Sequence, residues 1–251
     1  MANALRQIWQ AGGTAFNAWL AIPSGTTAEV MAGAGYDSVT VDLQHGLHDY
    51  ASMLQCFQAM QAHPVLPMVR VWANEAAIIG RAMDAGALGV ICPMVNTADQ
   101  ARAFVAAATY PPQGERSNGP LRAALYAAGN YQATANADTL RIAMIETQQA
   151  LDNLDAILST PGLDAIYVGP SDLGFSLGLP PILDREEPQI MAIYERLVAA
   201  ARRHGLVAGV HCVAPAYARR MAAMGFRLVT AGTDIGFVNA GSRAAVAALR
   251  A

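Results

Sequence analysis

Two acidic residues follow short apolar runs in the second half of the chain. Glu146 comes directly after residues 141–145, and Asp172 follows residues 165–168. A helical pattern and a turn signal at Pro161 separate the two runs, as expected for two parallel strands joined by a crossover helix. Parallel sheets bind ligands at the carboxyl ends of their strands. Two hard oxygen ligands at such an edge suit a Mg²⁺- or Mn²⁺-type ion, which keeps further positions for water and substrate.

The same two acids allow a simpler interpretation, because each precedes a predicted helix and could cap it. The segment before Asp172 favours a ligand-binding role. Gly169 is followed by Pro170 and Ser171, and a glycine before a fixed turn lets backbone N–H groups approach an anion closely. Position alone leaves capping and metal binding open.

Other predicted strands also end in side chains that could do chemistry. His45 lies three residues after Asp42, close enough for the carboxylate to orient the ring and raise its basicity. Such a pair is also common as local hydrogen bonding, and Arg70 could be a structural ion-pair partner. Trp19 and His211 are interpreted as core residues when each is taken alone. A metal pair, a base pair and a cation at strand ends are hard to explain together as packing.

Positioning these side chains at one edge requires a particular fold. The hydrophobic pattern predicts eight short strands, at residues 15–21, 38–42, 67–71, 89–93, 141–145, 165–168, 206–211 and 227–231. It predicts helices at residues 3–10, 26–32, 50–62, 75–85, 98–108, 151–158, 186–204, 215–224 and 234–250. This alternation in 251 residues predicts an α/β fold, a (β/α)₈ TIM barrel that forms a single domain over residues 1–251.

One stretch breaks the alternation. Residues 109–138 read as a long loop-rich insertion, and such insertions are often functional lids or contact segments. Its Arg116, Asn118 and Arg122 could bind a substrate carboxylate or hydroxyls, or could remain solvated.

Composition excludes several classes of protein. The net charge of -3 gives no electrostatic case for nucleic acid, and no apolar window is long enough to cross a membrane. Cys56, Cys92 and Cys212 lack the spacing of a zinc site and have apolar neighbours, which is typical of reduced thiols in a cytoplasmic protein. All 16 basic residues are arginine. Without a lysine, an aldolase that works through a lysine imine is excluded.

Four motifs occur in order along the chain: Val41-Asp42-Leu43-Gln44-His45-Gly46, Val69-Arg70-Val71, Met144-Ile145-Glu146-Thr147 and Val168-Gly169-Pro170-Ser171-Asp172-Leu173. Together they resemble the HpcH/HpaI family, the pyruvate-dependent class II aldolases typified by 4-hydroxy-2-oxoheptanedioate aldolase. The similarity runs almost end to end. It implies a barrel of the phosphoenolpyruvate/pyruvate superfamily type and a metal-dependent carbon–carbon lyase.

The resemblance also implies which residues bind the metal and the substrate. Glu146 and Asp172 would ligate a divalent ion (Mg²⁺, Mn²⁺ or Co²⁺) that chelates a 2-oxo acid. The backbone around Gly169, Pro170 and Ser171 would hold the carboxylate of that acid.

Catalytic roles are implied in the same way. Arg70 would stabilise the enolate oxygen, and His45, oriented by Asp42, would transfer a proton through a water on the metal. Trp19 would form the wall on the aldehyde side. The residue matching Asp84 would reach the site of a neighbouring subunit.

The family resemblance further implies a homohexamer, built as a trimer of dimers, with the C-terminal helix packed on a neighbour. Two positions depart from the family pattern. Gln44 stands where the family often has glutamate, and Met144 stands where many members have glutamine. Both departures bear on substrate and metal preference rather than on the class of reaction.

The predicted reaction is reversible cleavage of a 4-hydroxy-2-oxo acid into pyruvate and an aldehyde. The carbanion left on pyruvate C3 must place its charge on the keto oxygen, where a metal and a cation can stabilise it. Three alternatives remain at this stage: an acyl-CoA lyase of the malyl- or citramalyl-CoA type, a phosphoenolpyruvate-using enzyme, and a non-catalytic barrel that binds a small acid.

Overall fold

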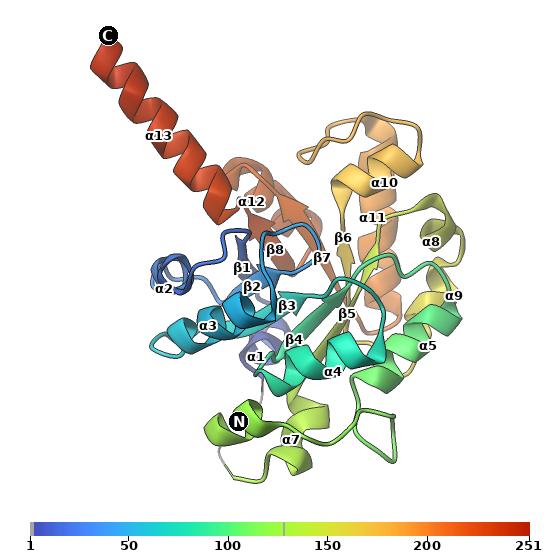
Figure 1. Cartoon of the computed structure of the whole chain (residues 1–251). Coiled ribbons are helices and arrows are strands. Elements are labelled where there is room, and N and C mark those ends of the chain that lie inside the picture. The colour runs from blue at the N-terminus through green and yellow to red at the C-terminus, as the bar shows by residue number, and fades with distance from the viewer. Residues whose placement is uncertain (1–2, 128) are drawn as a thin grey trace.

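The eight strands close into a parallel barrel (Figure 1). The computed structural model describes residues 3–127 and 129–251. Neighbouring strands pair in chain order, and the last pairs with the first. The strands are β1 (Ala15–Leu20), β2 (Ser38–Asp42), β3 (Leu66–Arg70), β4 (Gly89–Cys92), β5 (Leu140–Ile145), β6 (Ala165–Val168), β7 (Val207–Cys212) and β8 (Leu228–Ala231). The predicted TIM barrel is confirmed, and every strand boundary lies within one residue of its predicted position.

Helices surround the barrel and connect its strands. They are α1 (Ala4–Gln10), α2 (Gly25–Ala32), α3 (Tyr50–Met60), α4 (Ala76–Asp84), α5 (Ala98–Ala107), α6 (Leu121–Tyr126), α7 (Tyr131–Asp138), α8 (Gln148–Asp152), α9 (Leu154–Leu158), α10 (Pro170–Ser176), α11 (Pro188–Arg203), α12 (Pro215–Met224) and α13 (Asp234–Arg250). Local sequence sets several of the starts. Ser24 caps α2 by accepting a hydrogen bond from the Thr27 amide, and Asp49 and Ser52 form a capping box on α3.

Two predicted segments differ in the structure. Residues 109–138 do not form a continuous loop, because they contain α6 and α7. Tyr131 and Ala135, four residues apart, turn one face of α7 onto Tyr110 and Ala123 and form a small separate core. The predicted helix at residues 151–158 is two short helices that meet at Asn153. These helices are too short to give a clear periodic signal, and contacts with the rest of the fold stabilise them.

Alternation along the strands divides the core into two layers. In β5, Ile142 and Met144 point into the barrel, whereas Ala143 and Ile145 pack outward against helices. The same alternation in β6 turns Tyr167 inward. This two-residue period determines which side chains reach the barrel axis.

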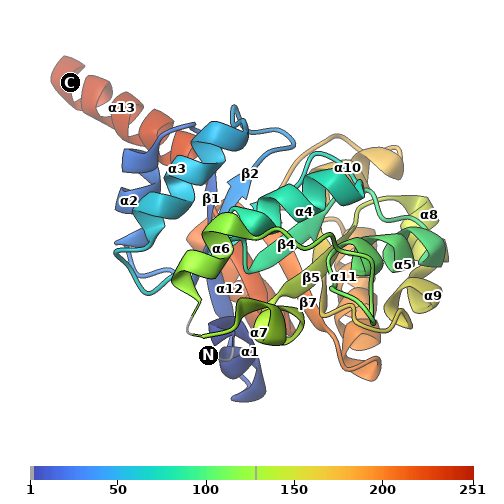
Figure 2. The ribbon, with the colours of Figure 1, turned by 60° about the horizontal axis from the view of Figure 1, so that its bottom comes forward.

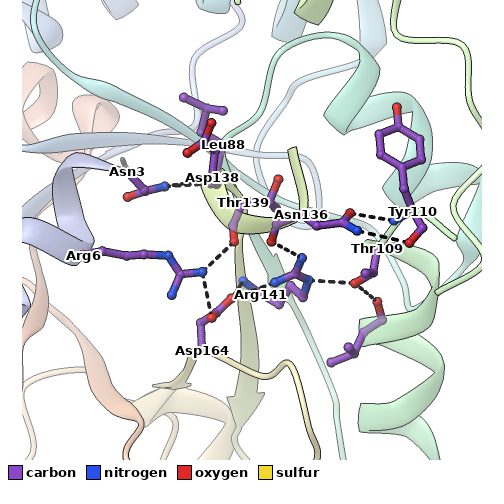
Figure 3. A network of polar contacts seen from close by, with 11 residues as sticks. Asn3, Arg6, Leu88, Thr109, Tyr110, Asn136, Asp138, Thr139, Arg141 and Asp164 are labelled. Atoms are coloured by element: carbon purple, nitrogen blue, oxygen red, sulfur yellow. Dashed lines mark hydrogen bonds and ion pairs between the residues drawn. The ribbon is translucent and has the colours of Figure 1, made fainter. Parts of the chain in front are cut away.

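Helix α1 packs against the inner layer at the amino-terminal end of the barrel, and Figure 3 shows its polar contacts there. Its Leu5 is fully buried in the inner layer. Arg6 donates a 2.9 Å hydrogen bond to the backbone just before β5 and forms an ion pair of 2.8 Å with Asp164. Arg141 binds the other oxygen of Asp164 from β5. This polar network attaches α1 across the strands, so the carboxyl ends remain as the open face.

Helix α13 extends away from the barrel (Figures 1 and 2). Asp234, its first residue, is its one buried residue. Ile235, Val238, Val246 and Leu249 are all exposed along it, although they are large and apolar. Among the described residues, no helix has the combination of length and apolar character needed to cross a bilayer.

Candidate active site

The carboxyl ends of the strands surround a cavity of about 310 Å³. Eight predicted site residues line it: Trp19, Asp42, His45, Arg70, Gly169, Pro170, Ser171 and Asp172. Six further residues line the cavity and were not predicted as site residues: Ala21, Met144, Tyr167, Leu183, His211 and Thr233. A larger groove of about 570 Å³ lies against α11, lined by groups such as Glu195 and Arg202. That groove contains none of the strand-end residues.

Asp42 and Arg70 form a buried bidentate ion pair. Arg70 Nε lies 2.8 Å from Asp42 Oδ1, and Nη2 lies 2.6 Å from Oδ2. The pair follows from the barrel register, which places these two residues directly opposite each other on β2 and β3. Trp19 adds an indole N–H bond to Asp42 and lies with its ring centroid 4.9 Å from the Arg70 guanidinium carbon. The guanidinium is therefore fixed in position at the cavity wall.

The surroundings of Asp42 keep it ionised. Burial by itself would raise the pKa of Asp42, but the hydrogen bond and charge of Arg70, with further bonds from Trp19 and the His45 backbone, bring the pKa below its ordinary value. The predicted Asp42–His45 side-chain pair is not formed. Instead, the backbone N–H of His45 donates a 3.3 Å hydrogen bond to Asp42 Oδ1. Asp42 thus orients Arg70 and the His45 loop rather than the imidazole ring.

Glu146 is a buried carboxylate at the end of β5, with 2% of its surface exposed. Its Oε1 accepts a 2.8 Å hydrogen bond from the backbone of Met94, a residue held at φ 56°. Its Oε2 lies beside Gly169, where an added Cβ would approach to 2.5 Å. Burial, together with the negative charge of Asp172, raises the pKa of Glu146 to about 7.

Asp172 lies in the first turn of α10 and is exposed. The first backbone bond of this helix runs from the Leu173 N–H to the Gly169 carbonyl. The N–H groups of Ser171 and Asp172 therefore have no backbone partner among the residues that the structure describes. The capping interpretation fails for Glu146, since Thr147 caps the helix that follows it.

The donor set fits a hard divalent cation. Glu146 is buried, its Oε2 accepts no hydrogen bond from the described residues, and the negative charge of Asp172 acts on it. Two like charges at close range are stabilised when a cation binds between them. Within the described residues there is no cluster of three or more His, Cys, Asp or Glu that would complete an all-protein site. Two carboxylates with the remaining positions open is an arrangement typical of Mg²⁺ or Mn²⁺.

His211 is not the enclosed core residue that the sequence interpretation favoured, because it forms part of the cavity wall. Tyr167 lies 3.3 Å from its Nδ1. Strand alternation could have identified both residues, since Tyr167 follows inward-facing Ala165 by two positions and His211 follows inward-facing Val207 by four. Counting every second residue along each strand would have predicted that both side chains point into the barrel.

Asp84 lies elsewhere. It ends α4 and forms a 2.7 Å ion pair with Arg116, and it lines a separate groove together with Arg122. Arg116 is almost fully buried, with its guanidinium 4.3 Å from the ring centroid of Tyr110. Asn118 accepts a hydrogen bond from Gln132. None of these residues lines the strand-end cavity of this chain.

Comparisons with known proteins agree with this geometry. Residues 16–240 match the model of the HpcH/HpaI aldolase/citrate lyase family. A hydroxypyruvate/pyruvate aldolase of Rhizorhabdus wittichii is 36% identical over 249 residues, 99% of each chain. A 2-keto-3-deoxy-L-rhamnonate aldolase of Salmonella gallinarum is 34% identical and covers 93% of this chain and 88% of its own. A crystal structure of a family protein from Burkholderia cenocepacia J2315 aligns with a TM-score of 0.91 at 31% identity, over 99% of this chain and 100% of the other.

Proposed function

Because the chain belongs to the HpcH/HpaI aldolase/citrate lyase family and is a carbon–carbon lyase, we propose that it catalyses reversible aldol cleavage of 4-hydroxy-2-oxo acids. The products are pyruvate, or a similar 2-oxo acid, and an aldehyde. This proposal rests on the fixed guanidinium of Arg70 and the carboxylate of Asp172 in the cavity wall, with the buried carboxylate of Glu146 next to Gly169 of the same wall.

Arg70 stabilises the charge that develops in the reaction. Cleavage leaves an electron pair on C3 of the 2-oxo acid, and this charge moves onto the keto oxygen. The bidentate bond to Asp42 holds the guanidinium in one orientation, so little reorganisation is needed when the charge appears. Trp19 supports this arrangement from the cavity wall.

His45 is the proposed group for proton transfer. It is exposed at the mouth of the cavity, and its backbone is tied to Asp42. Cleavage requires removal of the proton from the C4 hydroxyl, and condensation requires its return. A neutral imidazole can take this proton, and the imidazolium that results can give it back.

Glu146 and Asp172 are the proposed ligands of the divalent ion, Mg²⁺, Mn²⁺ or Co²⁺. The ion, when bound, supplies Lewis-acid polarisation of the keto group. The free N–H groups of Ser171 and Asp172 are suited to hold the substrate carboxylate, since they lie at the start of α10 and both residues line the cavity.

Chelation gives the direct test of this function. Pyruvate release from a 4-hydroxy-2-oxo acid, followed with lactate dehydrogenase, is expected to fall to background with excess EDTA and to return with Mg²⁺, Mn²⁺ or Co²⁺. Malyl-CoA and citramalyl-CoA serve as competing substrates. The aldolase proposal would be overturned if no metal restored pyruvate release. It would also be overturned if malyl-CoA or citramalyl-CoA were cleaved faster than the 4-hydroxy-2-oxo acid.

We also propose a cytoplasmic homohexamer arranged as a trimer of dimers. The exposed apolar side chains of α13 support an assembly in which a second copy covers this helix. Ile235, Val238 and Leu249 recur at helical spacing along one stripe, and burying them removes their apolar surface from water.

Introducing charges into the apolar stripe of α13 is expected to break the assembly. Val238→Glu/Leu249→Glu should shift the species seen by size-exclusion chromatography with light scattering from a hexamer to smaller forms, because charges would replace apolar contacts. Ala240→Glu/Ala244→Glu places the same charges on the opposite side of the helix and should leave the hexamer intact. A monomeric wild type, or a stripe variant that stays hexameric, would contradict the proposed role of α13.

A further inference from the structure

The loop between α10 and α11, residues 177–187, reaches the active-site cavity through Leu183. The next residue, Asp184, attaches this loop to the barrel. Its two carboxylate oxygens each accept a 2.8 Å hydrogen bond, one from the backbone N–H of Val213 and one from that of Ala214. These N–H groups lie between the end of β7 and the start of α12, where a helix has no partners of its own for them. The loop is therefore fastened to the end of β7.

Arg185 holds the same loop from the inside. Its side chain is fully buried, with Nη1 donating a 2.8 Å hydrogen bond to the Pro180 carbonyl and Nη2 lying 2.6 Å from a carboxylate oxygen of Glu187. Its backbone carbonyl accepts a 2.6 Å bond from the Tyr217 hydroxyl on α12. Charge-assisted bonds of this kind hold the two ends of a loop together. Leu183 lies between Pro180 and Arg185, so its backbone is fixed at the cavity.

The wall of the cavity has an inner and an outer part. Arg70 and Tyr167 belong to the inner part, because both lie on barrel strands. Ala21 follows the end of β1, and Leu183 comes from a loop beyond the strand ends, so both lie nearer the mouth. Leu183 is the largest aliphatic side chain of this outer part and is partly exposed. Ala21 and Leu183 thus give the mouth of the cavity an apolar surface.

On the proposed reaction, the aldehyde is the part of the substrate that reaches this apolar surface. The 2-oxo acid occupies the inner part, since Arg70 is assigned to its keto oxygen. The bond that forms or breaks joins C3 of that acid to the aldehyde carbon, and substituents of the aldehyde extend toward the mouth. Leu183 offers them no hydrogen-bonding group, and Arg116 and Arg122 do not line the cavity. A hydroxyl placed against Leu183 would lose water without gaining a partner there.

We propose, in an inference that rests on the aldolase function proposed above, that Leu183 is a specificity-determining residue for the aldehyde. Its side chain packs on the substituent of the aldehyde and favours an aliphatic substituent over a hydroxylated one of the same size. Asp184 acts as a positioning residue, because its two bonds to the end of β7 hold Leu183 in the cavity wall.

Two aldehydes of equal size test this inference: 2-methylbutanal, and glyceraldehyde, which carries hydroxyls in place of two of its methyl groups. The metal-loaded enzyme condenses each with saturating pyruvate, and kcat/KM is measured for the aldehyde. In Leu183→Asn, which keeps the side-chain size but replaces apolar surface with an amide, the ratio of 2-methylbutanal to glyceraldehyde is expected to fall about 10-fold. In Asp184→Ala it should fall by a smaller factor, because the loop is released from β7. Ile182→Asn makes the same change one residue away, at an exposed side chain outside the cavity, and should leave the ratio unaltered.

Reading the ratio within each variant removes general losses of activity or folding. A wild type that condenses pyruvate with neither aldehyde would overturn the aldolase function itself. A wild type that uses both, with an unchanged ratio in Leu183→Asn, would overturn the role of Leu183 and leave the aldolase function standing. A wild type that accepts glyceraldehyde alone would contradict the apolar contact, and so would a fall in the ratio that is as large in Ile182→Asn.

Discussion

Glu146→Gln is expected to lower turnover by about 10³-fold or more, the largest effect of any single substitution at the proposed active site. Glutamine keeps the side-chain volume and an oxygen for the Met94 N–H, so the contact at 2.8 Å can persist. It removes the negative charge that makes the position a ligand for a divalent ion. Loss of metal-based charge stabilisation costs several kcal/mol in the transition state, and each 1.4 kcal/mol is about a factor of ten in rate.

Calorimetric titration with Mn²⁺ separates this effect from misfolding. The Glu146→Gln protein should bind Mn²⁺ far more weakly, while Glu195→Gln, on the outer helix α11, should bind it as the wild type does. Unchanged Mn²⁺ affinity in Glu146→Gln would remove Glu146 from the proposed site.

The pH dependence of stability without metal gives a second measurement on the same variant. Burial raises the pKa of Glu146 to about 7 in the folded chain, against an ordinary value of 4.5. The folded state therefore binds the proton more tightly than the unfolded state, and this contribution to stability is lost as the pH rises through 7. Metal-free wild type should lose stability between pH 5 and pH 8 by up to about 3 kcal/mol from this group, and Glu146→Gln should not. Urea unfolding at the two pH values measures the difference.

Arg70→Lys is expected to lower kcat by about 10²- to 10³-fold, the range seen when one preorganised donor to a developing oxyanion is removed. Lysine keeps the positive charge but cannot make two parallel bonds to Asp42, which now lie at 2.8 and 2.6 Å. The ammonium is then free to move, and its position relative to the keto oxygen is no longer fixed. Steady-state kinetics with saturating metal give kcat directly.

Arg81→Lys is the matched control. Arg81 also lies over an aromatic ring, 4.2 Å from the centroid of Tyr50, but outside the active-site cavity. Its substitution should leave kcat within about twofold, as expected for a surface arginine without a buried partner. Equal losses in both variants would mean that the effect of Arg70 is general destabilisation, and an unaffected Arg70→Lys enzyme would exclude its role at the keto oxygen.

The barrel itself could be predicted from periodicity, because buried parallel strands give short continuous apolar runs between helices. Short helices escaped the same reasoning. In α7, the contacts of Tyr131 and Ala135 with a separate small core stabilise a helix whose own sequence is polar and weakly patterned. Such stabilisation comes from residues distant in the chain.

The site shows where sequence spacing misleads. Asp42 and His45 are near in sequence, which suggested a side-chain pair, but the register sets Asp42 against Arg70, 28 residues away. Opposite charge and bidentate geometry make Arg70 the stronger partner. His211 was misassigned for a related reason. Its place at the end of β7 was visible, while the opening beside it depends on how Trp19 and Tyr167 fill the barrel.

The closure of the barrel by α1 has a kinetic consequence. With its amino-terminal end filled by Leu5 and fastened by Arg6, the barrel leaves the strand-end mouth as the way in and out. On the proposed reaction, the 2-oxo acid lies inward against Arg70 and the aldehyde lies outward, nearer exposed His45. Because both products leave through the same opening, the aldehyde must leave before the 2-oxo acid. Run in reverse, the same geometry makes the 2-oxo acid the first substrate to enter and the aldehyde the second.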